Sequence, residues 1–402
     1  MSIISIQLGA QTFTSYTTAD GLISNFVECI DVDADNNVWV GTSDGVQMFD
    51  GFNWTLYNTS LDSGMVSDNI KIIKCLSDGL VWVGSDYGVS AFSLLANNWL
   101  TLNSTNGLIS NQVKSINEGV GSNGFLGPWI GTIQGVSFYN GFSFTSYASP
   151  DLHWSGVSAT AFDSNGEQWF GSPYGGITHF DGTNFTNYDT SNGLLSQNVT
   201  DIIIDSQDNK WIGTGSGISV LDASNTTFTH HTRMYILSPP DTLNPVVDLE
   251  IDSYGRIWAA IYVGYLAQGG VAMWNGSGWI DYDVTDGIIG SNVKGVATDS
   301  EDNIWVSTSE GVSKISAIPN DVYDAIPELK IFPNPSSDVI YLNNNGRHIQ
   351  QLRIYNNLGV IYYANSSVQE QYCINVASLA KGIYYIDLQL SERMITKKIV
   401  VN

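Results

Sequence analysis

Hydrophobic and polar positions alternate with a period of two along most of the chain, in short runs separated by turn-forming residues. Residues 198–205 form one such run, which ends at a polar turn over 206–209. Three further runs follow at 210–214, 217–221 and 227–230. Helical repeats would instead show apolar residues three and four positions apart over long windows. The pattern therefore predicts short β-strands in units of four.

A tryptophan-centred motif of the form Trp-x-Gly-Thr/Ser recurs along the chain at intervals of 40 to 47 residues, and its last two copies are looser. Each copy is followed within a few residues by a glycine, usually next to an aliphatic residue. A four-stranded repeat of this length is typical of a propeller blade. We therefore predict an all-β chain whose residues 11–316 form a seven-bladed β-propeller. The seven tryptophans are Trp39, Trp82, Trp129, Trp169, Trp211, Trp258 and Trp305.

The seventh repeat ends near Ser316 without an outer strand, which leaves the ring unclosed. Residues 12–16 match the outer-strand pattern of the other repeats. Because a sheet with an unpaired edge is a liability, we expect residues 12–16 to pair with residues 311–316. Within each blade, the tryptophan is expected to fill the wedge between neighbours, and the glycine two positions later to permit close approach.

A segment with two prolines and no alternation, residues 317–327, predicts a linker. Alternation then returns over 328–402, which we expect to form a small Ig-like β-sandwich. Four short motifs occur there in order, near Ile331, Leu352, Leu379 and Lys397. Their defining residues are Pro333, Asn334, Pro335, Gly359, Gly382, Tyr384, Lys397 and Lys398.

The repeat motifs together resemble the two-component regulator propeller repeat, on steps such as Asn106-Gly-Leu108 and Asn192-Gly-Leu194 and on turns such as Asn36-Asn-Val-Trp39. Such propellers often form the periplasmic sensing half of hybrid histidine kinases. The tail resembles the C-terminal sorting domain of type IX secretion in Bacteroidota. That resemblance implies the type IX machinery as a partner and a secreted or cell-surface location. An ordinary Ig-like carbohydrate-binding domain is the alternative for the tail.

The net charge of −24 is distributed unevenly. Residues 1–325 hold 8 basic and 34 acidic side chains, whereas residues 326–402 hold 7 and 5. An acidic body repels phosphate backbones and anionic lipids, which argues against nucleic acid and leaves a neutral or cationic partner. No apolar run is long enough to cross a bilayer. The cysteines Cys29, Cys75 and Cys373 lack metal-ligand spacing, so we expect free thiols, with a Cys29–Cys75 disulfide as the alternative.

Residues 1–10 form an apolar stretch that ends in Ala10 before Gln11. This arrangement is similar to the end of a secretory signal peptide, although a basic segment at its start is absent. An ordinary first strand is the alternative interpretation.

Alternate carboxylates in Asp31-Val-Asp33-Ala-Asp35 invite a calcium site. The twelfth and sixth loop positions hold Thr42 and Asn36, where a calcium loop needs Glu and Gly. Turns closed by the Asp side chains are the favoured explanation, so we expect no cofactor, with calcium the alternative. The histidines show no metal-ligand spacing, and no nucleophile elbow or phosphate-binding loop is present.

Added loop length occurs at 148–155, 233–245 and 261–268. Outer-to-inner connections and second-to-third strand turns emerge on one face of a propeller, so these three loops are expected on that face. Their aromatic and polar side chains suit a sugar or a peptide. We expect a non-catalytic module for glycan or protein; a polysaccharide lyase or hydrolase is the alternative. The candidate ligand-binding residues are His153, Trp154, Arg233, Tyr235, Tyr262 and Tyr265.

Overall fold

The computed structural model describes residues 12–61, 64–121, 124–234, 244–262, 269–316, 330–332, 336–343, 351–356, 360–365, 371–389 and 394–401. The chain divides into two compact units, Met1–Ile318 and Pro319–Asn402. The predicted leader at 1–10 and the predicted linker at 317–327 lie outside the described residues. No helix among the described residues is long and apolar enough to span a membrane.

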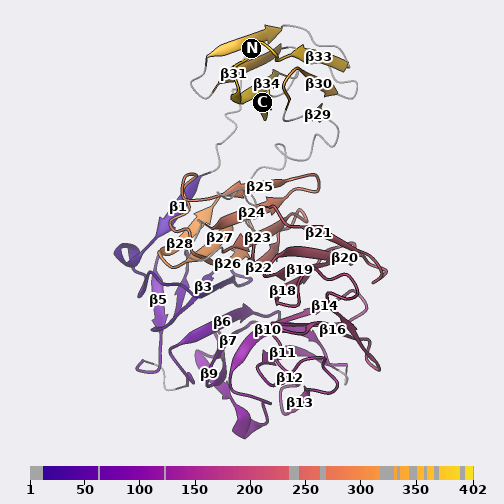
Figure 1. The fold of residues 1–402 in the computed structure, drawn as a ribbon. Helices are drawn as coiled ribbons and strands as arrows, with labels where there is room; N and C mark the ends of the chain where they lie inside the picture. Colours follow the sequence, from indigo (N-terminus) through magenta and orange to yellow (C-terminus); the bar gives the residue numbers. More distant parts are fainter. Residues whose placement is uncertain are drawn as a thin grey trace, which may run out of the picture. The chain divides into compact units, whose positions relative to one another are not determined.

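The first unit consists of seven four-stranded antiparallel sheets, which are the blades of the predicted propeller (Figure 1). Each inner strand contacts the inner strand of the next blade, and β26 contacts β2, which closes the ring. The inner strands are β2 (Cys29–Val32), β6 (Ile70–Cys75), β10 (Val113–Val120), β14 (Ala159–Phe162), β18 (Val199–Ile204), β22 (Val246–Ile251) and β26 (Val293–Thr298). We number the blades 1 to 7 in this order.

The second strand of each blade carries the Trp-x-Gly motif. These strands are β3 (Val38–Thr42), β7 (Leu80–Ser85), β11 (Leu126–Thr132), β15 (Gln168–Ser172), β19 (Lys210–Thr214), β23 (Ile257–Ile261) and β27 (Ile304–Thr308). The third strands are β4 (Gly45–Phe49), β8 (Gly88–Ser93), β12 (Gly135–Tyr139), β16 (Gly176–Phe180), β20 (Gly217–Leu221), β24 (Gly270–Trp274) and β28 (Gly311–Ile315).

The outer strands of blades 1 to 6 are β5 (Trp54–Tyr57), β9 (Asn98–Leu102), β13 (Phe144–Tyr147), β17 (Phe185–Tyr188), β21 (Phe228–His231) and β25 (Trp279–Tyr282). Two short 3₁₀ turns, Thr18–Asp20 and Ser104–Asn106, follow outer strands. The outer strand of blade 7 is β1 (Phe13–Tyr16), which pairs antiparallel with β28 from Phe13 opposite Ile315 to Tyr16 opposite Val312. The indigo β1 beside the orange β28 in Figure 1 confirms the predicted closure.

The motif tryptophans fill the space between blades, as the sequence predicts. Trp39 is fully buried among Ile70, Ile73 and Phe92 of blade 2. Trp305 packs on the blade 1 core at the point of closure. Burial of a large ring at each interface supplies a major part of the hydrophobic stabilisation of the ring.

The glycine two residues after the tryptophan is required by close contact. A Cβ atom at Gly41 would lie 2.6 Å from Cγ2 of Ile70 in the next blade. At Gly84 it would lie 2.6 Å from Cγ1 of Val113. The predicted close approach is therefore confirmed, and it lets successive blades pack without a gap.

An aspartate six residues before the tryptophan closes the turn between the first two strands. In blade 5, Asp205 accepts hydrogen bonds from the backbone N–H groups of Gln207 and Asn209, both at 2.9 Å. It also accepts from the indole Nε1 of Trp211 at 2.9 Å. The equivalent carboxylates bond their own tryptophans in four other blades, and they are Asp33, Asp163, Asp252 and Asp299.

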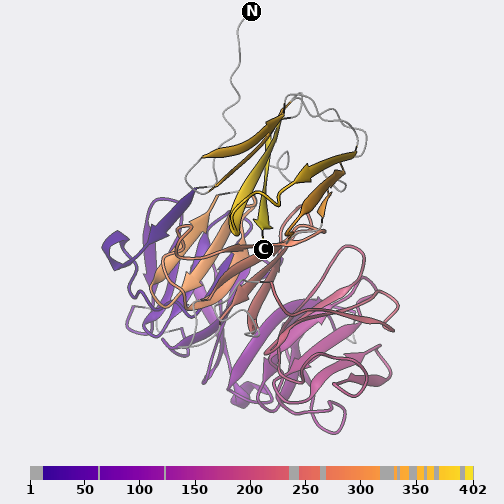
Figure 2. The same ribbon diagram turned by 45° about the horizontal axis from the view of Figure 1, so that its top comes forward.

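The second unit is a two-sheet sandwich, consistent with the predicted Ig-like tail (Figure 2). Strand order is β29-β30-β33 in one sheet and β32-β31-β34-β35 in the other. Residues from both sheets share one core that includes Ile340, Ile374, Leu352 and Ile386. The strands are β29 (Lys330–Phe332), β30 (Val339–Asn343), β31 (Gln351–Asn356), β32 (Ile361–Asn365), β33 (Gln371–Asn375), β34 (Gly382–Gln389) and β35 (Met394–Val401).

Two sequence predictions about single residues can be placed here. Cys29, Cys75 and Cys373 are free thiols, so the predicted free cysteines are confirmed and the alternative disulfide is absent. Of the sorting-motif residues, Gly382 and Tyr384 lie in β34, and Lys397 and Lys398 lie in β35. Pro333, Asn334, Pro335 and Gly359 lie outside the described residues.

Candidate functional site: the central channel

The seven inner strands surround a central cavity of about 370 Å³. This volume lies at the lower end of the range for small-ligand sites in proteins. Every blade contributes lining residues, so the cavity belongs to the ring as a whole. We call it the channel, and we call the face with the outer-to-inner connections the upper face.

One lining residue from each blade lies where the inner strand begins, next to the upper face. In five blades this residue sits at a β-bulge, where the register to the second strand shifts. A bulge inserts an extra residue and redirects its side chain. We call these seven residues the rim ring, and they are Glu28, Lys71, Lys114, Ser158, Thr200, Val247 and Lys294.

Aromatic side chains accompany the rim ring at blades 6, 7 and 1. The ammonium of Lys294 lies 5.0 Å from the ring centroid of Phe26 and 5.5 Å from that of Tyr262. Phe26 is 44% exposed. A lysine between two aromatic rings combines a charge with flat apolar surfaces.

Three carboxylates on inner strands each tie their own strand to the inner strand of the next blade. Oδ2 of Asp201 accepts from the backbone N–H of Leu249 at 2.9 Å. Oδ2 of Asp248 accepts from that of Val296 at 2.8 Å. Asp31 does the same for Cys75, at 2.7 Å. These carboxylates satisfy backbone donors on the free edges of the inner strands, so they have a structural role whatever else they do.

The deep carboxyl groups are perturbed by their surroundings. Burial raises the pKa of Asp201, and it raises the pKa of Asp248 further because the two carboxylates repel each other. Burial also raises the pKa of Glu250, to about 8. The pKa of Lys74 is raised chiefly by Asp31, whose carboxylate lies 3.7 Å from its ammonium. With a pKa of about 8, Glu250 is therefore expected to be largely protonated at neutral pH, inside a channel that also holds the charged Lys74.

The structure places the predicted ligand-binding residues in different blades. Trp154 lies in the connection to blade 4, 49% exposed, with its ring edge-on to Tyr174 at 5.9 Å. The backbone N–H of the neighbouring His153 donates to Oγ1 of Thr178. Tyr262 stands beside the rim ring through Lys294, as described above. Arg233 is exposed before blade 6, and Tyr235 and Tyr265 lie outside the described residues.

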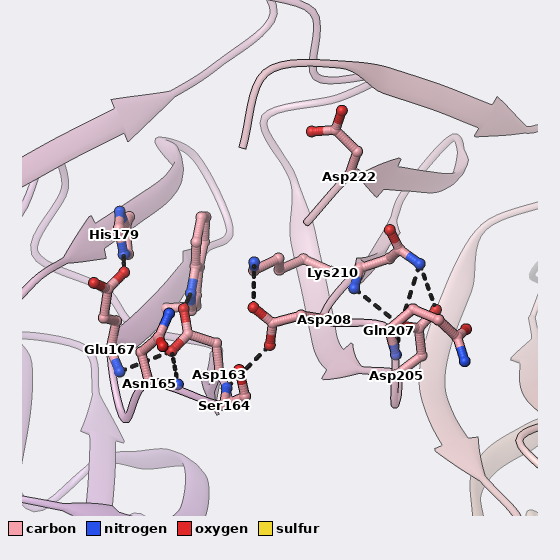
Figure 3. A network of polar contacts seen from close by, with 12 residues as sticks. Asp163, Ser164, Asn165, Glu167, His179, Asp205, Gln207, Asp208, Lys210 and Asp222 are labelled. Atoms are coloured by element: carbon pink, nitrogen blue, oxygen red, sulfur yellow. Dashed lines mark hydrogen bonds and ion pairs between the residues drawn. The ribbon is translucent and has the colours of Figure 1, made fainter. Parts of the chain in front are cut away.

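The opposite end of the blades carries a polar network in blades 4 and 5 (Figure 3). Nε2 of His179 lies 2.7 Å from a carboxylate oxygen of Glu167, and the His179 ring stacks on Trp169 at 4.1 Å. Lys210 lies over Trp169 at 5.0 Å and pairs with Asp208, which also accepts from the backbone of Ser164. This network joins the two blades.

The same network could hold a metal ion. Asp163, Glu167 and His179 each offer one ligand atom, and these atoms lie within 4.8 Å of one another. His179 lies in β16 and Glu167 just before β15, so strand pairing brings them together, and no local histidine spacing in the sequence reveals the contact. In the structure, Asp163 already accepts from two backbone N–H groups and from the indole of Trp169. A metal would have to compete with these bonds.

The rim-ring lysines were missed by sequence reasoning, although a signal exists. In six of the seven repeats the rim-ring residue stands eleven positions before the motif tryptophan. Lys114 stands fifteen positions before Trp129, because blade 3 has longer first and second strands. Alignment of the repeats on tryptophan would have placed most of the ring in one column, but nothing local marks that column as facing a cavity.

Comparison with known protein families gives one match in each unit. Residues 21–44 match the model described as "Two component regulator propeller", and residues 330–402 match "Secretion system C-terminal sorting domain". No curated protein sequence matches the chain.

Solved structures share the fold at low sequence identity. The extracellular domain of BT3049 of B. thetaiotaomicron, assigned to the hybrid two component systems, matches with a TM-score of 0.65 and 17% identity. The match covers 98% of this chain, and this chain spans 58% of that domain. Virginiamycin B lyase from Staphylococcus aureus matches with a TM-score of 0.58 and 15% identity, over 77% of this chain and 99% of the lyase. These likenesses establish the propeller fold.

The predicted tail is therefore confirmed as a sorting domain, which involves the secretion machinery. The predicted repeat is likewise confirmed by the match in blade 1. The chain combines a two-component-regulator-type β-propeller with a C-terminal secretion sorting domain, and it is destined for the cell surface or the cell exterior.

Proposed function

We propose that the protein is a non-catalytic binding module of the cell surface that holds part of a glycan at the upper mouth of the channel. The observation that carries this proposal is the cavity of about 370 Å³, lined by polar side chains from all seven blades. A cavity of this size suits one end of a sugar chain better than a protein surface, which would need a broad contact area. Phe26 and Tyr262 offer rings on which a sugar could stack.

A glycan array with the full-length chain tests this proposal, followed by calorimetry on any positive glycan. Tyr262→Ala should weaken binding by roughly 1–3 kcal/mol, by analogy with stacking on aromatic platforms. Trp154→Ala serves as the companion variant, because Trp154 lies on the same face but contacts Tyr174 instead of the rim ring. Loss of melting temperature without loss of binding in Tyr262→Ala would contradict a ligand contact and favour a packing role.

A polysaccharide lyase or hydrolase is the second candidate, and one observation favours it. Glu250, with a pKa raised to about 8, lines the channel together with Lys74, and such perturbed groups are typical of acid–base catalysis. Measurement of new reducing ends and of unsaturated products on every glycan that binds separates the two functions. Binding without turnover supports the module, and turnover that is lost in Glu250→Gln supports the enzyme.

A further inference from the structure

The basic residues of the propeller are concentrated in the channel. Of the eight Lys and Arg side chains in residues 1–325, four line the cavity. Three of the others have acidic partners elsewhere: Lys210 pairs with Asp208, Arg256 with Asp252, and Lys314 with Asp299. A body with 34 acidic residues therefore keeps half of its positive charges in one cavity. The four channel lysines are Lys71, Lys74, Lys114 and Lys294.

The bulges direct three of these lysines into the rim ring. Lys71, Lys114 and Lys294 each occupy the extra position where the inner-strand register shifts. Since a bulge takes a residue out of the regular alternation, its side chain is released from packing against the neighbouring blade. Lysine at three of five bulges places ammonium groups at the mouth of the channel.

The lysines differ in how far nearby carboxylates neutralise them. Lys294 lies 3.9 Å from Glu28, and Lys114 lies 3.7 Å from Asp86 in an exposed pair. The side chain of Lys71 has no ion pair or hydrogen bond with any residue in the described parts of the chain. Of the carboxyl groups deeper in the channel, Glu250 offsets this charge little at neutral pH, because burial raises its pKa to about 8.

Residues with hydroxyl groups line the channel on three consecutive blades, the first of which adjoins the blade of Lys71. Ser115, Thr160 and Thr200 line the channel from blades 3, 4 and 5. Their side-chain oxygens are buried and have no hydrogen-bond partner within the part of the chain that the structure describes. These three oxygens have almost no surface open to the channel, so the polar groups that a ligand meets on this side come from partly exposed lining residues such as Asn117 and Ser158.

From these observations we propose that the channel selects a carboxylated sugar, a uronic acid unit, whose carboxylate pairs with Lys71 and whose hydroxyls meet the wall of blades 3 to 5. The proposal rests on the glycan-binding function proposed above and specifies the ligand class of that site. Lysine binds a carboxylate as a point charge and donates up to three hydrogen bonds. The aromatic rings beside Lys294 would contact the apolar face of the sugar.

The test uses the full-length chain and four probes, which are oligogalacturonate and oligoglucuronate trisaccharides and the methyl ester of each. The acids should bind at least about tenfold more tightly than their esters, because a charge-assisted contact is lost on esterification. Lys71→Met should remove this preference, whereas Lys71→Arg should retain most of it. Lys381→Met is the matched control, because it removes the same charge from an exposed site in the second unit. A melting curve for each variant verifies that it is folded.

The outcomes separate this inference from the proposed function. Equal binding of acids and esters would overturn the selection of a uronic acid while leaving a glycan site in the channel. A preference for acids that survives in Lys71→Met would place the anion elsewhere and overturn the role of Lys71. If neither acid binds at millimolar concentration, the inference fails, and binding of a neutral glycan on the array then decides whether the proposed function survives.

Discussion

The bond between each turn aspartate and its tryptophan should be a measurable source of propeller stability. In blade 5, Asp205→Ala removes the acceptor of two backbone N–H groups and of the Trp211 indole. Water can reach the turn, but Trp211 is only 7% exposed, so its N–H loses its partner inside the blade interface. One buried donor that is left without an acceptor costs about 1–3 kcal/mol of stability, and the loss of the turn hydrogen bonds adds to this cost. We expect Asp205→Ala to lower the free energy of unfolding by about 2–4 kcal/mol.

A double-mutant cycle with Trp211→Phe isolates the bond itself. Phenylalanine keeps most of the ring but has no N–H, so Asp205→Ala should cost less in that background by roughly 1–3 kcal/mol. Chemical unfolding of the propeller, followed by near-UV circular dichroism, measures each corner of the cycle. A coupling energy below about 0.5 kcal/mol would refute the reasoning.

Blade 3 provides the natural control for this cycle. The indole nitrogen of Trp129 is buried without a hydrogen-bond partner within the described residues. Trp129→Phe therefore loses ring area alone, whereas Trp211→Phe loses area and a bond. Trp211→Phe should therefore lower the free energy of unfolding more than Trp129→Phe does, and this difference should have the same sign as the coupling energy.

Three further predictions follow from the structure. Folding raises the pKa of Glu250 from its ordinary value of 4.5 to about 8. The free energy of unfolding should therefore fall progressively as the pH rises between these values, because ionisation of Glu250 destabilises the fold. In Glu250→Gln, unfolding curves measured over the same pH range should show a smaller fall. Gly41→Ala should cost about 1–3 kcal/mol by thermal unfolding, because its Cβ would lie 2.6 Å from Ile70, whereas Gly278→Ala, with nothing within 4 Å, should be nearly neutral. Deletion of residues 328–402 should hold the protein in the periplasm in a folded state, as cell fractionation and limited proteolysis would reveal, and unchanged surface delivery would contradict the role of the tail.

The fold was readable from the sequence because every blade repeats the same contacts. Trp39 and Trp305 fill equivalent interfaces, and Gly41 and Gly84 meet the next blade in the same way. Because the same packing contact recurs in seven blades, the residues that make it recur periodically in the sequence. This periodicity identified the strands and the closure by residues 12–16. The second unit was equally readable, because its motifs occur in order near the chain end.

The candidate site was less readable, for a physical reason. Sequence reasoning directed attention to loops with added length, and of those loops Tyr262 stands beside the rim ring whereas Trp154 contacts Tyr174. Lys71 stands in an ordinary apolar strand pattern, and only the bulge between Ile70 and Ile72 turns it toward the channel. A bulge depends on pairing with the neighbouring strand, so the residues around Lys71 in the sequence do not predict it.

Positions of the rim ring differ from positions in the blade interfaces in how strongly packing restricts the residue type. This difference affects how the net charge of the chain bears on its ligand. Positions that contact the next blade repeat their residue type, whereas the rim position holds Glu, Lys, Ser, Thr or Val. A substitution there changes the lining of the channel, and at Ser158 it would also remove a hydrogen bond of 2.6 Å to the backbone of Val199 in the next blade. Screening limits the reach of exposed surface charge to roughly 8–10 Å at physiological salt. The potential that a ligand meets in the channel is therefore governed by Lys71 and its neighbours, and the net charge of −24 does not exclude an anionic ligand.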